Sequence, residues 1–340
     1  MGVEELQAIA EALVAPGKGI LAADESTGTI EKRFDSIGIE STEGQRRAYR
    51  HMLFTTAGVE EYISGVIMYD ETIRQSGGDG TPFAQLLAAK GIVPGIKVDK
   101  GAKALANAPG EKVTEGLDGL RERLNEYAAL GAKFTKWRAV IAIGPGIPSQ
   151  YCTWTNAHAL ARYAALSQEA GLVPIVEPEV LMDGDHDIET ALRVTSRVQN
   201  AVFTELHDQR VELEGMLLKP NMVLSGYDCP EQASDEEVAE RTLHCLRHNV
   251  PSAVPGIVFL SGGQSDEDAT ARLNVMNARG PHPWELSFSY GRALQAPSLK
   301  AWGGDPERVD AGQRAFYHRA KMNGAARSGL YAPDMETAAA

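Results

Sequence analysis

Cysteine is scarce in this sequence, and its three cysteines are odd in number and widely spaced. A disulfide framework needs paired cysteines, and a structural zinc site needs closely spaced cysteine and histidine ligands, so neither is predicted. The eight histidines are scattered, and only His244 and His248 have a spacing that can bind metal, on a helix expected to be solvated. We therefore predict no metal, no cofactor, and a chain that works in a reducing compartment, the cytoplasm.

Long apolar runs are also missing. No run approaches the ~20 residues that cross a bilayer, although 43% of the residues are hydrophobic. The first ten residues, MGVEELQAIA, are acidic and lack the apolar segment of a signal peptide. Basic residues are outnumbered, and the net charge of −13 argues against nucleic acid and membrane surfaces as partners. Basic side chains that converge in such a chain therefore need a specific explanation.

What the sequence does contain is a regular alternation of apolar strands and amphipathic helices. Strands are predicted at 19–24, 64–70, 93–99, 133–142, 172–179, 213–222, 256–261 and 284–290. Helices are predicted at 3–15, 43–57, 117–130, 155–170, 187–208, 234–247, 266–278 and 306–323. A doubly wound sheet is disfavoured because no glycine-rich dinucleotide turn is present. Eight such units predict an α/β fold, a (β/α)8 TIM barrel, as one domain over 1–340, with an N-terminal helix and a short flexible tail from about 333 to 340.

The predicted strand at 213–222, LEGMLLKPNM, carries a lysine near its end. Strand alternation places Gly215, Leu217 and Lys219 on one face, so the amine points the same way as core residues. A lysine is almost never fully buried without a partner or a purpose. Two interpretations are open: a strand-end lysine that extends to solvent, or an amine that forms a Schiff base with a carbonyl substrate.

In a barrel of this type, chemistry collects where the strands end. Seven predicted strand ends carry polar groups: Asp24; Lys97 and Asp99; Lys136 and Arg138; Glu177 and Glu179; Lys219 and Asn221; Ser261, Gly262 and Gly263; and Tyr290, Gly291 and Arg292. Alternation places Lys136 and Arg138 on one face and turns Trp137 toward the helices. So many charged strand ends together favour a reaction site over isolated surface lysines.

These segments resemble the class I fructose-1,6-bisphosphate aldolase family. The similar motifs are LAADEST (21–27), GIKVDKG (95–101), KWR (136–138), VPIVEPE (173–179), LLKPNM (217–222), FLSGGQS (259–265) and SYGRALQA (289–296). The resemblance runs from about residue 17 to 332. It implies a metal-independent (β/α)8 lyase, usually a homotetramer, that acts in glycolysis and gluconeogenesis. Such an enzyme reversibly cleaves fructose 1,6-bisphosphate into dihydroxyacetone phosphate and glyceraldehyde 3-phosphate, so its partners are small sugar phosphates.

The resemblance also implies roles for five residues. Lys219 matches the Schiff-base lysine, Glu177 the acid/base for carbinolamine dehydration, and Asp24 the carboxylate at the C4 hydroxyl. Lys136 matches a second site lysine, and Glu179 supports the lysines or serves only as an ion-pair partner. Bringing a lysine pKa from ~10.4 to about 7 takes roughly 4–5 kcal/mol. A like charge at ~4 Å supplies about 4 kcal/mol at an effective dielectric of 20, so we expect Lys136 to contribute much of this and desolvation the rest.

Two phosphates require two anion sites. The first is expected at Ser261, Gly262 and Gly263, before a helix N-terminus, and is completed by the segment Tyr290-Gly291-Arg292 as in the family. For the second, the match implies Lys97 and Arg138, with Ser26, Lys32 and Arg33 as further candidates. Lys32 and Arg33 fall early in a helix, where a solvated surface is the competing interpretation.

Two other functions stay open: a different Schiff-base sugar-phosphate lyase or transferase with a barrel fold, or a binding or scaffolding role. A scaffold would be expected to lose Lys219, Glu177 or Asp24, and all three are present. One departure is evident, because many family members end in a tail whose terminal tyrosine protonates the enamine. Here Tyr331 is the last tyrosine, so we expect deletion of 334–340 to change kcat by less than about threefold.

Overall fold

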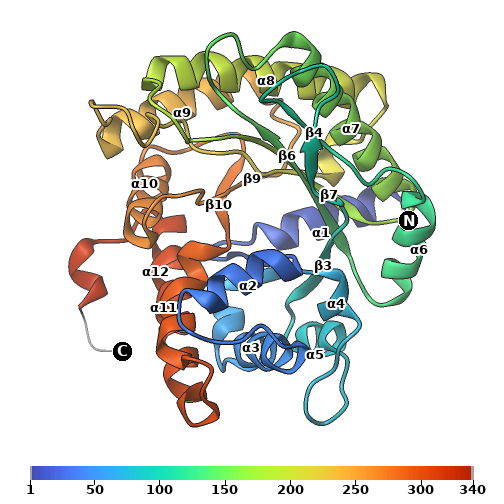
Figure 1. Ribbon diagram of the computed structural model, residues 1–340, viewed down its shortest axis with the longest axis vertical. Helices are drawn as coiled ribbons and strands as arrows, with labels where there is room; N and C mark the ends of the chain where they lie inside the picture. Colours follow the sequence, from blue (N-terminus) through green and yellow to red (C-terminus); the bar gives the residue numbers. More distant parts are fainter. Residues whose placement is uncertain (1, 338–340) are drawn as a thin grey trace.

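Eight parallel strands close into a barrel in the computed structural model, which describes residues 2–337 (Figure 1). The strands in order around the barrel are β1 (Gly19–Ala23), β2 (Ile63–Met68), β3 (Val93–Lys97), β6 (Phe134–Ile141), β7 (Val173–Val180), β8 (Leu217–Leu218), β9 (Gly256–Phe259) and β10 (Glu285–Tyr290), which pairs back with β1. Each barrel strand pairs with the next one along the chain, as expected for repeated βα units. The predicted (β/α)8 barrel is confirmed.

Helices cover the outside of the barrel, and Figure 1 shows α7, α8 and α9 side by side along one edge. Their bounds are α1 Val3–Leu13, α2 Thr27–Asp35, α3 Glu43–Thr55, α4 Asp70–Ile73, α5 Phe83–Ala89, α6 Leu120–Ala129, α7 Gln150–Glu169, α8 Ile188–Asp208, α9 Asp235–Asn249, α10 Asp266–Ala278, α11 Arg292–Trp302 and α12 Val309–Arg327. Side chains of Ser149, Asp187, Ser234 and Ser265 cap α7 to α10 by accepting backbone N–H groups of the first turn. None of the helices within 2–337 is long and apolar enough to span a membrane.

The amino-terminal half of the barrel interior is filled with apolar side chains. Helix α1 closes this end with Leu6, Ala10, Leu13 and Val14, which pack on Ile20, Ile67, Phe134, Val173, Ile175, Leu217 and Val258. Glycine is required at position 95, because a Cβ there would lie 2.3 Å from the ring of Phe134. Outside the barrel, Trp137 turns toward the helices as predicted and stacks on Tyr163 of α7, with ring centroids 5.5 Å apart. Polar groups that enter the barrel are therefore confined to its other half.

The strand expected over 213–222 is much shorter in the structure. Leu213–Gly215 forms the 3-10 turn η2, and β8 contains only Leu217 and Leu218. Pro220 has no N–H to donate to a ladder, so regular pairing stops there. Lys219 still belongs to the barrel, because its N–H donates to the carbonyl of Val176 at 2.8 Å.

Several other segments differ from the sequence predictions. The connection from β3 to β6 contains an unpredicted antiparallel hairpin, β4 (Ala102–Ala104) with β5 (Lys112–Thr114). Helix α7 begins at Gln150 rather than near residue 155, because Ser149 caps it. Helix α11 was not predicted, and three further 3-10 turns lie at Val59–Glu61 (η1), Pro306–Arg308 (η3) and Pro333–Glu336 (η4). These are short or irregular elements that apolar periodicity does not reveal.

The segment predicted as a flexible tail begins with the ordered turn η4. Glu336 is held on α12, with Oε1 2.5 Å from Arg319 Nη1 and Oε2 3.0 Å from His318 Nε2. The Tyr331 hydroxyl also donates to Glu336 Oε1 at 3.0 Å. Residues 333–337 thus pack against α12, the predicted flexibility of the tail stays a prediction, and residues 338–340 lie outside the described part of the chain.

Candidate active site

A cavity of about 740 Å³ opens at the carboxyl ends of the barrel strands. All the predicted site residues except Tyr290 line it: Asp24, Ser26, Lys32, Arg33, Lys97, Lys136, Arg138, Glu177, Glu179, Lys219, Ser261, Gly262, Gly263, Gly291 and Arg292. Tyr290 is fully buried, and its hydroxyl donates to the carbonyl of Ala269 on α10 at 2.9 Å. The Tyr290 side chain therefore faces the outer core, and the prediction that it contributes to binding is wrong.

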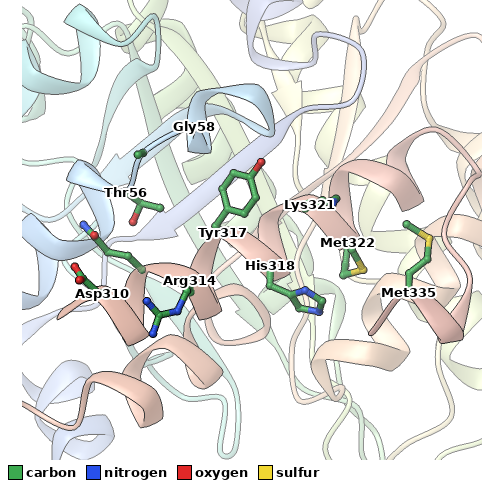
Figure 2. A pocket seen from close by; sticks show the side chains of 11 residues that line it. Thr56, Gly58, Asp310, Arg314, Tyr317, His318, Lys321, Met322 and Met335 are labelled. Atoms are coloured by element: carbon green, nitrogen blue, oxygen red, sulfur yellow. The ribbon is translucent and has the colours of Figure 1, made fainter. Parts of the chain in front are cut away.

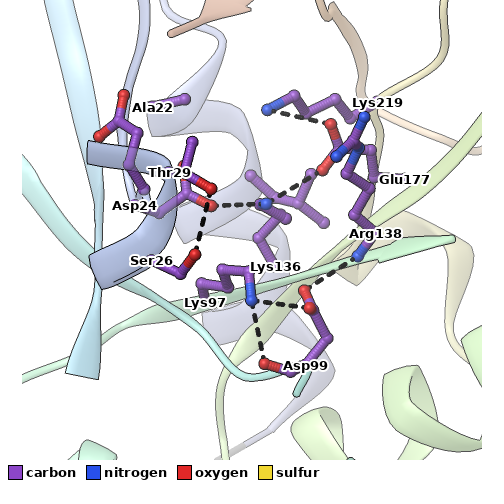
Figure 3. A network of polar contacts seen from close by, with 12 residues as sticks. Ala22, Asp24, Ser26, Thr29, Lys97, Asp99, Lys136, Arg138, Glu177 and Lys219 are labelled. Atoms are coloured by element: carbon purple, nitrogen blue, oxygen red, sulfur yellow. Dashed lines mark hydrogen bonds and ion pairs between the residues drawn. The ribbon is translucent and has the colours of Figure 1, made fainter. Parts of the chain in front are cut away.

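Two lysines and two carboxylates form a continuous chain of contacts at the bottom of the cavity (Figure 3). Lys219 Nζ lies 3.3 Å from Glu177 Oε1, and Lys136 Nζ lies 3.2 Å from Glu177 Oε2. Lys136 Nζ is also 2.5 Å from Asp24 Oδ2. Glu177, Lys136 and Lys219 are only 3–4% exposed. The four side chains are thus linked by ion-pair contacts in a site that largely excludes water.

Neighbouring strands bring these four residues together. Lys136 lies within β6, Glu177 within β7, and Lys219 directly after β8, and β6, β7 and β8 are consecutive in the barrel. Asp24 follows β1 on the other side of the interior. Side chains that share the inward face of parallel strands converge at one end of a closed barrel. The strand alternation read from the sequence therefore places the four charges correctly.

The environment of the two lysines differs. Burial lowers the pKa of Lys219, and the charge of Lys136 lowers it further, while Glu177 acts in the opposite direction. Burial also opposes the charge of Lys136, but Asp24 and Glu177 outweigh it and raise its pKa. Lys219 is therefore the amine that loses its proton more readily. Our expectation that Lys136 supplies much of the shift is corrected, because burial is the larger cause.

The carboxylates remain ionised in this cluster. Burial alone would raise the pKa of Asp24, but Lys136 and Lys219 overcome it and hold the pKa well below its usual range. The pKa of Glu177 is lowered in the same way, against burial, by Lys136 and Lys219. Both carboxylates are thus proton acceptors in this arrangement rather than proton donors.

Two buried oxygens at this level make no hydrogen bond within residues 2–337. One is Glu177 Oε2, which lies at ion-pair distance from Lys136, and the other is Ser289 Oγ on β10. Ser289 also lines the cavity and was missed in the sequence analysis. Ser287 and Ser289 are two residues apart and therefore share one face of β10. The Ser287 hydroxyl donates to the carbonyl of Lys18 inside the barrel, so this alternation was the signal that could have found Ser289. Both oxygens can contact a bound molecule.

On one side of the cavity mouth, the loop after β9 meets the start of α11. Arg292 Nη2 donates to the carbonyl of Gly262 at 2.7 Å and has no acidic partner among the described residues. Gly262 has a φ of +56°, and a Cβ there would lie 1.9 Å from Met182, so only glycine fits. Arg33 also lies here, since a Cβ on Gly291 would stand 3.6 Å from Arg33 Nη2. Arg33, predicted for the other phosphate, therefore lies beside Gly291, the residue before Arg292.

The cations predicted for the other phosphate are paired with acids. Lys97 Nζ lies 2.7 Å from Asp99 Oδ1, and Arg138 forms an ion pair with Glu179 (Figure 3 shows the Lys97 contact). Ser26 Oγ lies 3.1 Å from Thr29 Oγ1, and Lys32 is exposed at the rim. Glu179 thus contacts Arg138 rather than a lysine, which agrees with its interpretation as an ion-pair partner.

Among residues 2–337, the features outside this cavity offer no comparable chemistry. A second hollow of about 650 Å³ lies between residues 56–58 and α12, lined by Tyr317, Met322 and Met335 among others (Figure 2). It contains no paired lysine and carboxylate. Across residues 2–337, no group of three or more histidine, cysteine or acidic side chains is placed to hold a metal ion. His244 and His248 stack on each other at the exposed surface of α9.

Comparison with known proteins gives consistent matches over nearly the whole chain. The family model described as fructose-bisphosphate aldolase class-I matches residues 5–340. A probable fructose-bisphosphate aldolase class 1 of Xanthomonas campestris is 61% identical over 332 residues, covering 97% of this chain and 99% of that protein. Fructose-bisphosphate aldolase 1 of Toxoplasma gondii is 56% identical over 330 residues, covering 96% and 91%. The Plasmodium falciparum aldolase, solved with TRAP and a small-molecule inhibitor, superposes with a TM-score of 0.96 at 50% identity, covering 97% of this chain and 96% of that one.

Proposed function

The chain belongs to the class I fructose-bisphosphate aldolase family and has the aldehyde-lyase activity of that family, and we propose that this activity proceeds through a Schiff base on Lys219. The observation that carries the proposal is the contact chain from Lys219 through Glu177 and Lys136 to Asp24. It supplies a nucleophile, a proton carrier and a base within one buried cluster.

Imine formation begins with the neutral amine of Lys219, which burial favours over the ammonium form. The nitrogen attacks C2 of the ketose and forms a carbinolamine. Glu177 Oε1, 3.3 Å from Lys219 Nζ, is placed to take the proton that the Lys219 ammonium group loses before the attack. The attacking nitrogen gives one of its own protons to the carbonyl oxygen, and Glu177 then passes the stored proton to the leaving hydroxyl. Water departs and leaves a protonated imine, while Glu177 returns to its ionised form.

Cleavage then requires a base at the C4 hydroxyl, which we assign to Asp24. Removal of that proton breaks the C3–C4 bond, releases glyceraldehyde 3-phosphate, and moves the electron pair into the imine to form an enamine. The contact of Asp24 with Lys136 keeps the carboxylate ionised but makes it a weak base. We therefore expect the substrate hydroxyl to separate Asp24 from Lys136 when it binds, which strengthens the base at the point of reaction.

Protonation of the enamine completes the cycle and frees dihydroxyacetone phosphate by hydrolysis. Tyr331, the last tyrosine, donates its hydroxyl to Glu336 on the outer face of α12. We assign this proton to a group inside the cavity: the proton that Asp24 took from the C4 hydroxyl passes through Lys136 to Glu177, the carboxyl in contact with Lys219. The same carboxyl then serves both proton transfers on the Lys219 side.

The two phosphates are assigned to the two sides of the cavity mouth. Arg292, with Ser261, Gly262 and Gly263, takes the phosphate next to the reacting carbonyl, and Arg33 is added to this side because it lies beside Gly291. Lys97, Arg138, Ser26 and Lys32 take the other phosphate. Both assignments follow the matched motifs and the contacts described above.

The cellular setting is proposed from family membership. We infer that the chain is a cytoplasmic homotetramer acting in glycolysis and gluconeogenesis, without metal or cofactor. A relative from Arabidopsis thaliana that is 54% identical over 333 residues is described as a cytosolic fructose-bisphosphate aldolase. Incubation with EDTA is expected to leave cleavage unchanged, and a loss that a divalent ion restores would exclude this mechanism.

Covalent trapping tests the central proposal. Dihydroxyacetone phosphate and borohydride should add one reduced triose phosphate per chain, located on Lys219 by peptide mass spectrometry. The Lys136→Met variant is the matched control, because it keeps Lys219 and should be trapped more slowly but at the same lysine. An adduct on another lysine, or no adduct with active protein, would exclude Lys219 as the nucleophile.

A further inference from the structure

Glu25 is a buried carboxylate that the proposed reaction does not use, although it directly follows Asp24. It is 8% exposed and forms ion pairs with two arginines, Arg33 of α2 and Arg50 of α3. Gln295 of α11 also donates to it, from Nε2 to Oε1 at 2.9 Å. Three helices therefore meet on one carboxylate at the edge of the cavity.

The rear of this cluster is rigidly held. Gln295 Nε2 also donates to the carbonyl of Ala22 at 2.7 Å, which ties the cluster to the end of β1. Gln295 Oε1 accepts from Tyr49 at 3.1 Å and from Arg50 Nη1 at 3.3 Å. Arg50 is 3% exposed and does not line the cavity. Arg50 is therefore a buried counter-ion of Glu25, and its side chain is not exposed to a substrate in the cavity.

Arg33 differs from Arg50 because it lines the cavity. Its side chain is 25% exposed, and Nη1 donates to Glu25. Among residues 2–337, no partner accepts from its Nε or Nη2. Nη2 lies beside Gly291, one residue before Arg292. Arg33 is thus anchored at one nitrogen and presents free donors where a phosphate is expected.

The charges in this cluster explain why the ion pair with Glu25 does not cancel the attraction of Arg33 for phosphate. A single carboxylate facing a single arginine would neutralise it, but Glu25 is shared between Arg33 and Arg50. Together with Arg292, the group keeps an excess of positive charge in a chain whose net charge is −13. A free arginine loses its rotamer freedom when it binds, whereas an anchored one has lost it beforehand.

We propose that Glu25 is a positioning residue that fixes the Arg33 guanidinium against the substrate phosphate beside Arg292. The inference rests on the proposed function and deepens it, because it adds a residue that acts on phosphate binding only through Arg33. The competing explanation is a purely structural ion pair that joins α2 to α3. That explanation predicts changes in stability without a change in KM.

A matched pair of variants separates the two explanations. Arg50→Met keeps the contact between Glu25 and Arg33, so KM for fructose 1,6-bisphosphate should change by less than about threefold. Glu25→Gln in the Arg50→Met background removes both buried charges together and leaves Arg33 without its anchor. We expect KM to rise about tenfold relative to Arg50→Met, with kcat within about threefold. An unchanged KM between these two variants would overturn the proposal.

Dependence on Arg33 is the second arm. Arg33→Ala alone should raise KM about tenfold, and adding Glu25→Gln and Arg50→Met should raise it no further. A further rise would mean that Glu25 does not act through Arg33. If the glutamine variants fail to fold, Glu25→Asp replaces them. Its shorter side chain keeps the charge but moves it away from Arg33, so KM should rise about threefold. An unchanged KM in a folded Glu25→Asp protein would count against the proposal.

Borohydride trapping distinguishes failure of this inference from failure of the proposed function. At saturating dihydroxyacetone phosphate, each folded variant should still form the adduct on Lys219. Normal trapping with unchanged KM values rejects only the role of Glu25. An absent adduct in the unaltered protein rejects the Schiff-base mechanism itself.

Discussion

The two halves of the barrel interior are built from the same strands but have opposite characters. Leu217 and Lys219 are two residues apart at β8, and Leu217 packs with α1 while Lys219 enters the charged cluster. The same contrast separates Phe134 from Lys136 on β6. The amino-terminal half therefore stabilises the barrel, and the carboxyl-terminal half performs the chemistry.

The energetics of the two halves differ accordingly. Fully burying a leucine or phenylalanine side chain contributes about 1.5–3 kcal/mol, and α1 adds such contacts with Leu6 and Leu13. Buried charges are favourable only when they are paired, and even then a well-packed apolar replacement is often as stable. Burial lowers the pKa of Lys219, which has the direction expected for such a cost. Burial of the Lys219 amine thus reduces stability in the charged half, while the contacts of Asp24 and Glu177 with Lys136 offset part of the cost.

Replacing Lys219 with methionine should give the largest effect and separate activity from stability. Loss of the nucleophile should lower kcat by roughly 10⁴-fold or more. The thermal midpoint should not fall, because the variant no longer buries an amine whose folded-state pKa lies below its unfolded value. Steady-state assays and calorimetry on one preparation check both expectations. A clear drop in the midpoint would show that Lys219 also supports the fold.

Leu217→Ala is the reciprocal change on the same strand and face. Leu217 is fully buried, so truncation should lower the free energy of unfolding by about 3 kcal/mol. The folded fraction should keep kcat within about threefold, because the cluster above it is unchanged. Denaturant unfolding and active-site-normalised kinetics provide the measurement. A loss of kcat as large as that of Lys219→Met would erase the distinction between the halves.

Arg292→Ala tests the mouth of the catalytic half, away from the reacting bond. Removing a guanidinium that lacks an acidic partner among residues 2–337 should raise KM about tenfold with little change in kcat. Affinity for dihydroxyacetone phosphate should fall to a similar extent, because its phosphate occupies the same side. A pure kcat loss would instead place Arg292 at the transition state.

Of the two halves of the barrel interior, only the charged half should make stability depend on pH. The folded pKa values of Asp24 and Glu177 lie below their ordinary values of 3.8 and 4.5. Their stabilising contribution is therefore complete above about pH 4.5 and is lost as the pH falls through the folded values. Asp24→Asn should reduce the acid slope by up to about 1.4 kcal/mol per pH unit, the value for one proton. Leu217→Ala, measured alongside, should leave the slope unchanged.

The smallest effect on turnover is expected from the C-terminal segment, which belongs to neither half. Deleting 334–340 should change kcat by less than about threefold. The deletion removes Glu336, the ion-pair partner of the buried Arg319, so the free energy of unfolding should fall by about 1–2 kcal/mol. Deletion of 338–340 alone is the control and should alter neither quantity. A tenfold loss of kcat in either truncation would show that the segment takes part in catalysis.

Much of the barrel and its site could be predicted from the sequence because the signals are local. Alternation has a period of two residues, so it placed Lys136 and Arg138 on one face and Trp137 toward the helices without any knowledge of the tertiary structure. Parallel strands also end at the same edge, which gathered Asp24, Glu177 and Lys219. The same pattern missed Ser289, because serine at a strand end carries no charge to mark it.

Only the tertiary structure decided how the charges are partnered. Lys136 contacts Asp24, 112 positions away in the sequence, and Glu25 contacts Gln295 at a separation of 270. Such pairings depend on barrel closure and side-chain rotamers, which no local pattern encodes. The same holds for the place of Arg33 beside Gly291 and for the attachment of Glu336 to α12. The sequence by itself determined that the charged side chains at the strand ends face the cavity, and closure of the barrel determined which of them touch.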